Sequence, residues 1–195
     1  MRTARDGAHA LREALRGEGG TVATRLADPS ADLPADLPAD LPADPPVLDQ
    51  PGPAQVAAAG PRTRGQAREY ELLLEMILEG YRLHYAAPLV VRPDDADLAL
   101  LLGDQLYALG LSRLAELGDL EAVGELADVI SLAAQAHSAA DPALARAVWE
   151  AGAVSVGWGA SEAYEDAKSR ARAHDPDATN ALRAAAAAAR GRRDL

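Results

Sequence analysis

Most of the chain beyond residue 65 has the spacing of apolar residues that is typical of α-helices. Leucine, isoleucine, tyrosine and alanine recur at intervals of three and four, as they do on one face of a helix. Five stretches carry this pattern, and the links between them are short. The pattern therefore predicts helices over residues 66–85, 94–118, 119–137, 143–174 and 178–190.

The starts of the predicted helices have matching local chemistry. Asp94 or Asp95 can cap the free amides of the second helix, and Asp119 those of the third. Asp141 precedes a proline at the first position of the fourth helix. The middle of that helix, residues 152–161, is rich in glycine and small side chains. We expect this part either to pack very closely on a neighbour or to break the helix.

The first 64 residues differ from the rest. Residues 1–27 are weakly amphipathic and predict only a marginal helix, because glycines follow it closely. Residues 28–64 begin with three consecutive Ala-Asp-Leu-Pro units. Proline every fourth residue forbids a helix and the run of aspartates repels itself, so this segment is predicted to be a disordered, extended spacer. The alternative is a docking motif that presents three leucines to a partner: Leu33, Leu37 and Leu41.

These patterns predict an all-α fold, an antiparallel helical bundle with a disordered Pro/Asp-rich N-terminal segment. The bundle domain is expected over residues 65–175. It follows a weakly helical segment at 1–27 and the linker at 28–64. An alanine-rich C-terminal helix and a basic tail follow at 176–195. Because this last helix has little to bury, we expect it to be marginal alone.

Composition and charge narrow the classes of function. The net charge of -11 disfavours nucleic acid as a partner, because affinity for phosphate backbones needs clustered cations. The absence of cysteine excludes disulfides and thiolate metal sites. The chain shows no apolar signal region and no run of about 18 apolar residues, so we expect no transmembrane segment and a cytoplasmic protein. The charged stretch 162–172 is predicted to be a solvated helix face with ion pairs.

Few residues offer chemistry, and the sequence predicts no catalytic residue, no metal site and no cofactor. Asp94, Asp95 and Asp97 are carboxylates of the kind that hold Mg²⁺. Carboxylates at the start of a helix are better explained as an N-terminal cap, which interacts favourably with the positive end of the helix dipole. His84 and His137 stand outside any metal-ligand spacing, which favours structural or surface roles.

The second predicted helix carries polar residues beside its apolar stripe. Gly103 inside a helix costs up to about 1 kcal/mol relative to alanine, so it indicates close contact with another helix. Asp104 is expected to find a donor if it is buried, and Tyr107 and Arg113 are nearby candidates. On the preceding helix three residues share a face that could flank a groove: Tyr81, His84 and Tyr85.

The run LALLLGDQLYALGLSRLAELGDLEAVGELADVISLAAQ resembles one segment of the trans-polyprenyl diphosphate synthases. In that family a helix with an apolar-Gly-Asp-aromatic run leads into LA-x-x-GD and a further helix. The preceding PLVVRP stands where the synthases have a short extended connection. The matching residues are Leu102, Gly103, Asp104, Tyr107, Leu114, Ala115, Gly118, Asp119, Leu126, Ala127 and Ile130.

The same resemblance implies that the chain lacks synthase activity of its own. Catalytic synthases carry two aspartate-rich motifs that bind the Mg²⁺-diphosphate of the substrate, and neither is present. Leu98 stands where the last aspartate of DDxxD belongs. The chain is similar in kind to the small non-catalytic subunit of the two-component heptaprenyl diphosphate synthases, whose Leu-x-Gly-Asp-Tyr run has Gln105 in place of tyrosine here. That subunit sets product length, which implies a role in menaquinone side-chain synthesis.

Two functions stay open. The resemblance implies a non-catalytic accessory subunit that binds a catalytic polyprenyl diphosphate synthase subunit. The alternative is a helical interaction or adaptor module without an isoprenoid role, which binds itself or another protein. In both cases the partner-binding or structural residues are predicted on the first two long helices: Tyr81, His84, Tyr85, Leu102, Gly103, Asp104, Leu106, Tyr107 and Leu109.

Overall fold

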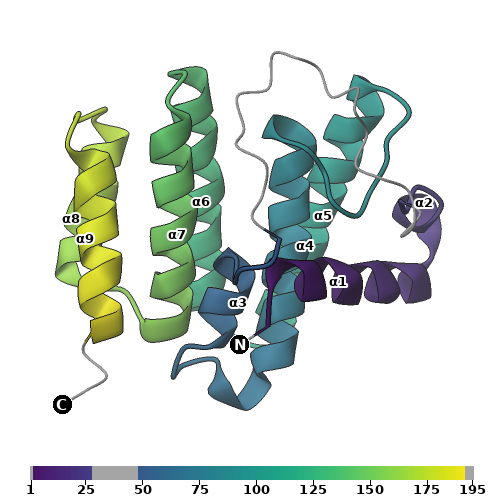
Figure 1. Cartoon of the computed structure of the whole chain (residues 1–195), viewed down its shortest axis with the longest axis horizontal. Helices are drawn as coiled ribbons and strands as arrows, with labels where there is room; N and C mark the ends of the chain where they lie inside the picture. Colours follow the sequence, from purple (N-terminus) through teal and green to yellow (C-terminus); the bar gives the residue numbers. More distant parts are fainter. Residues whose placement is uncertain (1, 28–47, 192–195) are drawn as a thin grey trace. The chain divides into compact units, whose positions relative to one another are not determined.

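A computed structural model describes residues 2–27 and 48–191 of the chain (Figure 1). Within these ranges the protein is all-α, as predicted, with no strand and one isolated β-bridge between Leu26 and Val91. The antiparallel arrangement of a bundle stays a prediction. The chain divides into two compact units. Unit 1 comprises Met1–Gln55 with Glu71–Arg113, and unit 2 comprises Val56–Tyr70 with Leu114–Leu195.

Unit 1 begins with a helix that is more firmly held than its sequence pattern predicted. α1 (Ala4–Glu18) starts in a capping box, in which Thr3 Oγ1 accepts from Asp6 N and the Asp6 carboxylate accepts from Thr3 N. Leu11 and Leu15 are 0% and 1% exposed. The expectation of a marginal helix was wrong, because these two buried leucines anchor α1 in the core of unit 1.

Three further helices belong wholly or largely to unit 1: α2 (Gly20–Ala23), α4 (Ala67–Tyr85) and α5 (Ala96–Glu116). α4 and α5 confirm the first two long helices of the sequence pattern. Asp95 Oδ1 accepts from Leu98 N at 2.8 Å, so Asp95 is the capping residue of α5. One cluster of buried apolar residues in this unit comprises Ala8, Leu11, Leu15, Val22, Met76, Leu83, Leu89, Val90, Val91, Leu102 and Leu106.

An extended connection joins α4 to α5. Its middle residues, Val90 and Val91, are both 0% exposed. Ala27 N donates to Val90 O at 2.8 Å, and Arg92 N donates to Arg25 O at 2.7 Å. These backbone hydrogen bonds pair the connection with the chain that follows α2.

Part of the predicted linker is structured. α3 (Pro53–Ala58) lies within it, and Ala4 N donates to Gln50 O at 2.9 Å. The prediction of disorder over 28–64 was therefore wrong for residues 48–64. These residues contain a helix and form hydrogen bonds with other folded parts of the chain. Residues 28–47, which hold the Ala-Asp-Leu-Pro units, lie outside the described residues.

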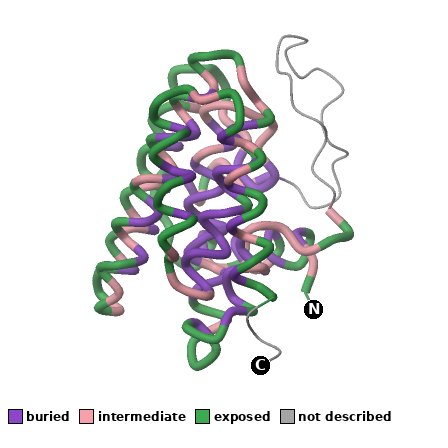
Figure 2. Tube along the Cα trace, turned by 90° about the vertical axis from the view of Figure 1, so that its left-hand side faces the viewer, coloured by how far each residue is buried: buried purple, intermediate pink, exposed green. Residues whose placement is uncertain are grey.

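Unit 2 is built around four helices that lie side by side in Figure 1: α6 (Leu120–Ser138), α7 (Pro142–Trp158), α8 (Glu162–Arg172) and α9 (Ala178–Gly191). Asp119 and Asp141 cap α6 and α7, as the sequence predicted. Figure 2 shows buried and exposed positions alternating along the helices, as expected for elements with one apolar face. α9 buries more than its alanine-rich sequence predicted, because Leu182 is 0% exposed.

The predicted fourth helix is two helices. The chain breaks between α7 and α8, where Gly159 has φ +90° and the Ser161 side chain accepts from Tyr164 N at 3.3 Å as a new N-cap. Close packing occurs as well. A Cβ at Gly152 would lie 2.2 Å from Val129 Cγ2. Both expectations for residues 152–161 are thus confirmed, at different glycines, and the single helix over 143–174 was wrong.

A tight backbone contact fixes the start of unit 2. A Cβ at Gly60 would lie 2.1 Å from the carbonyl oxygen of Gly157, so only glycine fits there. Arg62 N donates to the same carbonyl at 3.0 Å. The buried Thr63 hydroxyl donates to Ala57 O at 2.7 Å. The Thr63 hydroxyl also lies 3.2 Å from Gly60 O, and the turn continues into the 3-10 helix η1 (Arg64–Gln66).

No helix among residues 2–27 and 48–191 combines the length and the apolar character that crossing a membrane requires.

Candidate functional site

The predicted site residues gather in unit 1 where α4 and α5 touch. A Cβ at Gly80 would lie 2.9 Å from Gly103 O, and one at Gly110 would lie 2.4 Å from Ile77 Cγ1. A Cβ at Gly103 would lie 2.6 Å from the imidazole ring of His84. The expected close contact at Gly103 is confirmed, and three glycines along the contact allow it.

Aromatic rings collect beside this contact. The rings of His84 and Tyr107 are stacked, with centroids 5.3 Å apart and an interplanar angle of 7°. Tyr85 lies 5.6 Å from His84 and 5.6 Å from Tyr81, centroid to centroid. The structure therefore brings together four of the predicted residues, which we call the aromatic cluster: Tyr81, His84, Tyr85 and Tyr107.

Asp104 lies at the edge of the aromatic cluster. Its carboxylate is 72% exposed, and Oδ1 is 3.1 Å from His84 Nε2. His84 Nε2 makes no hydrogen bond to the described part of the chain, and the two groups form a charge pair when the imidazole is protonated. A donor was expected for Asp104 only if its carboxylate was buried, and that condition is not met. Arg113, one of the two candidate donors, pairs with Glu18.

Tyr107 has an enclosed hydroxyl. Its oxygen is buried and makes no hydrogen bond to the part of the chain that the structure describes. Burial raises the pKa of Tyr107, and the neighbouring Tyr85, Tyr81 and Asp104 raise it further. A neutral, enclosed phenol of this kind is a poor general base.

The predicted leucines are mostly interior. Leu102 and Leu106 are 1% and 0% exposed and belong to the core of unit 1. Leu109 packs against that core. None of the three is open on the surface, so a partner would have to meet other residues of α5.

The exposed large apolar side chains of α5 belong to two residues that are adjacent in sequence. Leu100 is 47% exposed and Leu101 67% exposed. Exposed carboxylates stand before and after them on the same helix, at Asp97 and Asp104. We call these four residues the α5 patch. The sequence pattern missed it, because a helix with so many leucines does not reveal which of them face outward.

The aspartates at the start of α5 have separate roles. Asp95 caps the helix, and Asp94 pairs with Arg25. Within the described ranges no three His, Cys, Asp or Glu side chains are grouped as a metal site. The cap interpretation from sequence agrees with the contact at Asp95.

α4 carries a chain of buried carboxylates that the helical pattern did not predict. Glu75 and Glu79 are 0% exposed, and Glu71 is 5% exposed. Gln55 Nε2 donates to Glu71 Oε1 at 3.1 Å and to Glu75 Oε1 at 3.0 Å. Arg2 pairs with Glu71 at 3.3 Å. The signal was present: glutamates four residues apart fall on one helix face that also carries apolar residues.

Glu79 holds the connection between α4 and α5. Its Oε1 accepts from Val90 N at 2.6 Å and Val91 N at 3.0 Å, and its Oε2 accepts from Leu89 N at 3.0 Å. Arg82 donates to Glu79 at 3.2 Å and to Glu75 at 3.3 Å. A buried carboxylate therefore satisfies three backbone amides that no helix or strand would otherwise pair.

Glu75 has a different environment. Burial raises its pKa, and Arg82 and Gln55 only partly oppose that effect. Three carboxylates, Glu71, Glu75 and Glu79, meet two guanidinium groups, Arg2 and Arg82. The raised pKa of Glu75 favours its protonated form more than that of a solvent-exposed glutamate.

Unit 2 contains a second buried polar cluster, centred on Lys168. Its Nζ lies 3.1 Å from Glu125, 2.9 Å from Asp128 and 3.0 Å from Glu165, and its side chain is 5% exposed. Tyr164 donates a hydrogen bond to Glu125. The prediction that residues 162–172 form a solvated face was wrong for Lys168. It holds for Arg170 and Asp166, which pair in solvent.

Lys168 should resist amine-reactive reagents. Its neighbouring carboxylates raise its pKa, outweighing the opposite effect of burial, so the unprotonated amine is scarce. We expect acylation of Lys168 by an N-hydroxysuccinimide ester to be at least about ten-fold slower in the folded chain than in denaturant. Mass spectrometry of peptides containing Lys168 measures both rates. Equal rates would contradict the burial, and Glu125→Gln should speed the labelling.

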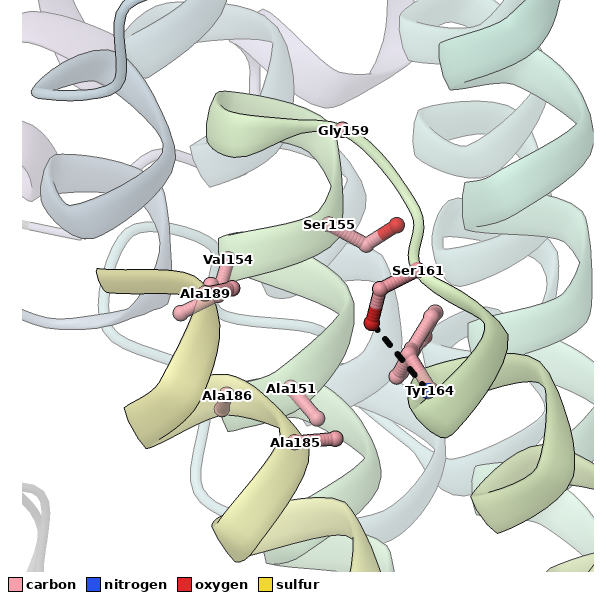
Figure 3. A pocket seen from close by; sticks show the side chains of 9 residues that line it. All are labelled: Ala151, Val154, Ser155, Gly159, Ser161, Tyr164, Ala185, Ala186 and Ala189. Atoms are coloured by element: carbon pink, nitrogen blue, oxygen red, sulfur yellow. Dashed lines mark hydrogen bonds between the residues drawn. The ribbon is translucent and has the colours of Figure 1, made fainter. Parts of the chain in front are cut away.

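A small cavity lies among α7, α8 and α9 (Figure 3). Its volume is about 10 Å³, room for about one water molecule. Four alanines, Val154 and Gly159 line it together with three polar residues: Ser155, Ser161 and Tyr164. In Figure 3 the Ser161 hydroxyl points toward the start of α8, where it caps Tyr164 N. The cavity holds no charged group in its lining, and its volume is below that of ordinary ligand sites.

Asp119 joins several parts of unit 2. It accepts from Tyr70 Oη at 2.6 Å and from Ala122 N at 3.0 Å, and it lies 3.4 Å from Arg62. Burial opposes its ionisation, but these donors outweigh burial, and the pKa of Asp119 is lowered. The Gly-Asp mark of the family resemblance is here a helix cap.

The lowered pKa of Asp119 predicts a pH dependence. A carboxyl whose folded pKa is below its unfolded value adds stability above about pH 4, and that stability is lost as the pH falls through the folded pKa. We expect Asp119→Asn to lower the free energy of unfolding most near neutral pH. The difference in free energy between the variant and the wild type should become smaller toward pH 2. Urea unfolding at a series of pH values measures this difference. A constant difference would show that ionisation of Asp119 does not contribute.

No protein-family model, no protein of curated function and no solved structure significantly matches this chain.

Proposed function

We propose that the chain is a helical accessory subunit that acts by binding another protein, and that its partner is a catalytic polyprenyl diphosphate synthase subunit. The observation that carries the binding role is the α5 patch, where Leu100 and Leu101 are exposed on a helix whose other leucines are buried or partly buried. The identity of the partner rests on the resemblance of the run that contains this helix. The pathway would then be isoprenoid synthesis of a menaquinone side chain.

A binding role without a reaction also fits the polar clusters. The carboxylates of α4 are engaged by backbone amides, Gln55 and arginines, and Lys168 is engaged by three carboxylates. Groups held in this way stabilise the fold and have no open side from which a substrate could approach. The aromatic cluster likewise lacks an activated nucleophile beside His84.

Co-purification tests the proposal. A tagged chain expressed in its native host should recover a polyprenyl diphosphate synthase, and Leu100→Ser with Leu101→Ser should abolish the recovery while circular dichroism stays unchanged. Leu102 and Leu106 are unsuitable positions for this test, because polar residues there would unfold the core. Adding the chain to the purified synthase should change the length of the prenyl product.

A second candidate is an adaptor without an isoprenoid role. The observation in its favour is that the marks of the resemblance have packing roles: Leu102 fills the core, Gly103 allows helix contact and Asp119 caps α6. Leucine-rich helix pairs of any origin need such residues. Recovery of a partner outside isoprenoid synthesis, or of the chain alone, would favour this candidate.

A further inference from the structure

The α5 patch has a regular arrangement of apolar and acidic side chains. Asp97 precedes Leu100 and Leu101 by three and four residues, and Asp104 follows them by four and three. Residues at these spacings are neighbours on a helix surface. The two leucines are therefore bracketed by carboxylates on one face of α5.

The openness of the two leucines is unusual within this chain. Over residues 2–27 and 48–191, the large hydrophobic side chains that are clearly exposed are Leu100, Leu101 and Leu120. Two of these three are adjacent. The next residue, Leu102, is 1% exposed, so α5 turns one face to the core and presents the leucine pair on the other.

We infer that the α5 patch docks a helical segment of a partner protein whose apolar side chains cover the leucines and whose Lys or Arg side chains pair with Asp97 and Asp104. This inference rests on the proposed function, that the chain acts by binding a protein. The two carboxylates are seven residues apart, about 10 Å along the helix. A matching partner helix therefore carries basic residues about seven apart with apolar residues between them.

The two carboxylates of the α5 patch argue against two other binding partners, a lipid membrane and a second copy of the chain. Anionic lipid headgroups would be repelled by Asp97 and Asp104, since membrane-surface helices place cations beside their apolar face. A second copy of the chain, related by a twofold axis through the leucines, would place Asp97 of one copy opposite Asp104 of the other. Like charges in that position oppose association.

Two designed peptides test the inference on the full chain. Both are helical with the same leucine seam; one carries arginines seven residues apart beside the seam, and the other carries glutamates there. Fluorescence anisotropy at low and physiological salt measures binding. We expect only the arginine peptide to bind, and more weakly at the higher salt.

Substitutions then locate the site. Leu100→Ser with Leu101→Ser should weaken binding of the arginine peptide about ten-fold or more. Asp97→Asn with Asp104→Asn should weaken it about five-fold at low salt. The matched control, Glu116→Gln with Glu162→Gln, removes the same charge from exposed helix positions elsewhere and should change binding less than two-fold, which is about 0.4 kcal/mol. Circular dichroism shows whether each variant is folded.

Several results would overturn the inference. Equal binding of both peptides, or full binding by the aspartate variants, would remove the role of charge. Dimerisation of the wild type that Leu101→Ser abolishes would identify a second copy as the occupant. Binding only after Leu33, Leu37 and Leu41 are changed to serine would identify the chain's own repeats. If the aspartate variants recover a partner from the native host at wild-type level, this inference is wrong but the proposed function is not contradicted. If the wild-type chain recovers no partner, the result counts against the proposed function itself.

Discussion

Glu79→Gln should lower the free energy of unfolding of unit 1 by about 3–5 kcal/mol. The carboxylate of Glu79 accepts three backbone hydrogen bonds from residues 89–91 and one from Arg82, with no exposure to water. An amide offers one acceptor oxygen and turns a donor toward backbone N–H groups. It also leaves Arg82 short of one negative partner.

Two measurements on the full chain detect this loss. Urea unfolding should show a lower midpoint, and hydrogen exchange should become faster at the amides of Leu89, Val90 and Val91. The second readout separates loss of the Glu79 hydrogen bonds from a general loss of stability, because these amides are the ones that the carboxylate binds.

Glu75→Gln is the matched control, one helical turn away and equally buried. Because burial raises the pKa of Glu75 and no backbone amide in the described part of the chain donates to it, an amide is better tolerated there than at Glu79, which accepts three backbone hydrogen bonds. The bond from Gln55 persists through the amide oxygen of the substituted side chain. We expect a loss below about 1.5 kcal/mol. Equal losses from both variants would contradict the role assigned to the three backbone hydrogen bonds of Glu79.

Gly60→Ala should destabilise unit 2 by about 3 kcal/mol or more. The added methyl group would lie 2.1–2.4 Å from the backbone O, C and Cα of Gly157. Backbone atoms inside a packed helix cannot move aside as a side chain can, so α7 or the turn before η1 must shift. That shift would also break the hydrogen bond from Arg62 N to Gly157 O.

Thermal unfolding followed by circular dichroism measures the effect, and Gly124→Ala is its control. Gly124 lies inside α6 with no atom of another element within 4 Å of a Cβ placed there. Alanine is the better helix former, so this variant should gain up to about 1 kcal/mol. A gain in stability from Gly60→Ala, or a loss of stability from Gly124→Ala, would show that the space around each glycine does not determine these effects.

Local chemistry predicted the long helices well. The periodicity of apolar residues located α4, α5 and α6, and Asp95, Asp119 and Asp141 cap helices where short carboxylates were expected. The failures arose where distant residues decide. α1 is held by Leu11 and Leu15 in a core that its own weak pattern does not reveal.

The break between α7 and α8 shows a different limit. Glycine and small residues at 152–161 are compatible with a close contact and with a turn, and sequence spacing does not distinguish the two. Gly152 faces Val129 and stays helical, whereas Gly159 has φ +90° and ends the helix. Only the positions of the neighbouring helices separate these outcomes.

The candidate site was predicted in part. Gly103, His84 and Tyr107 do meet, since helical spacing places residues of one face in line. Periodicity did not distinguish buried from exposed leucines on α5, because leucines occupy several consecutive positions of this helix. It also passed over Glu75, Glu79 and Lys168, because charged residues are expected in water unless a specific partner compensates their burial.

Lys168 is the one lysine in the sequence, and it is enclosed by α8 and α6. Enzymes that mark proteins for degradation through a lysine amine would find no such amine on the folded surface. The turnover of this chain by such a route would therefore depend on how often α8 detaches, and a mutation that loosens α8 would shorten the lifetime of the protein in the cell without touching the α5 patch.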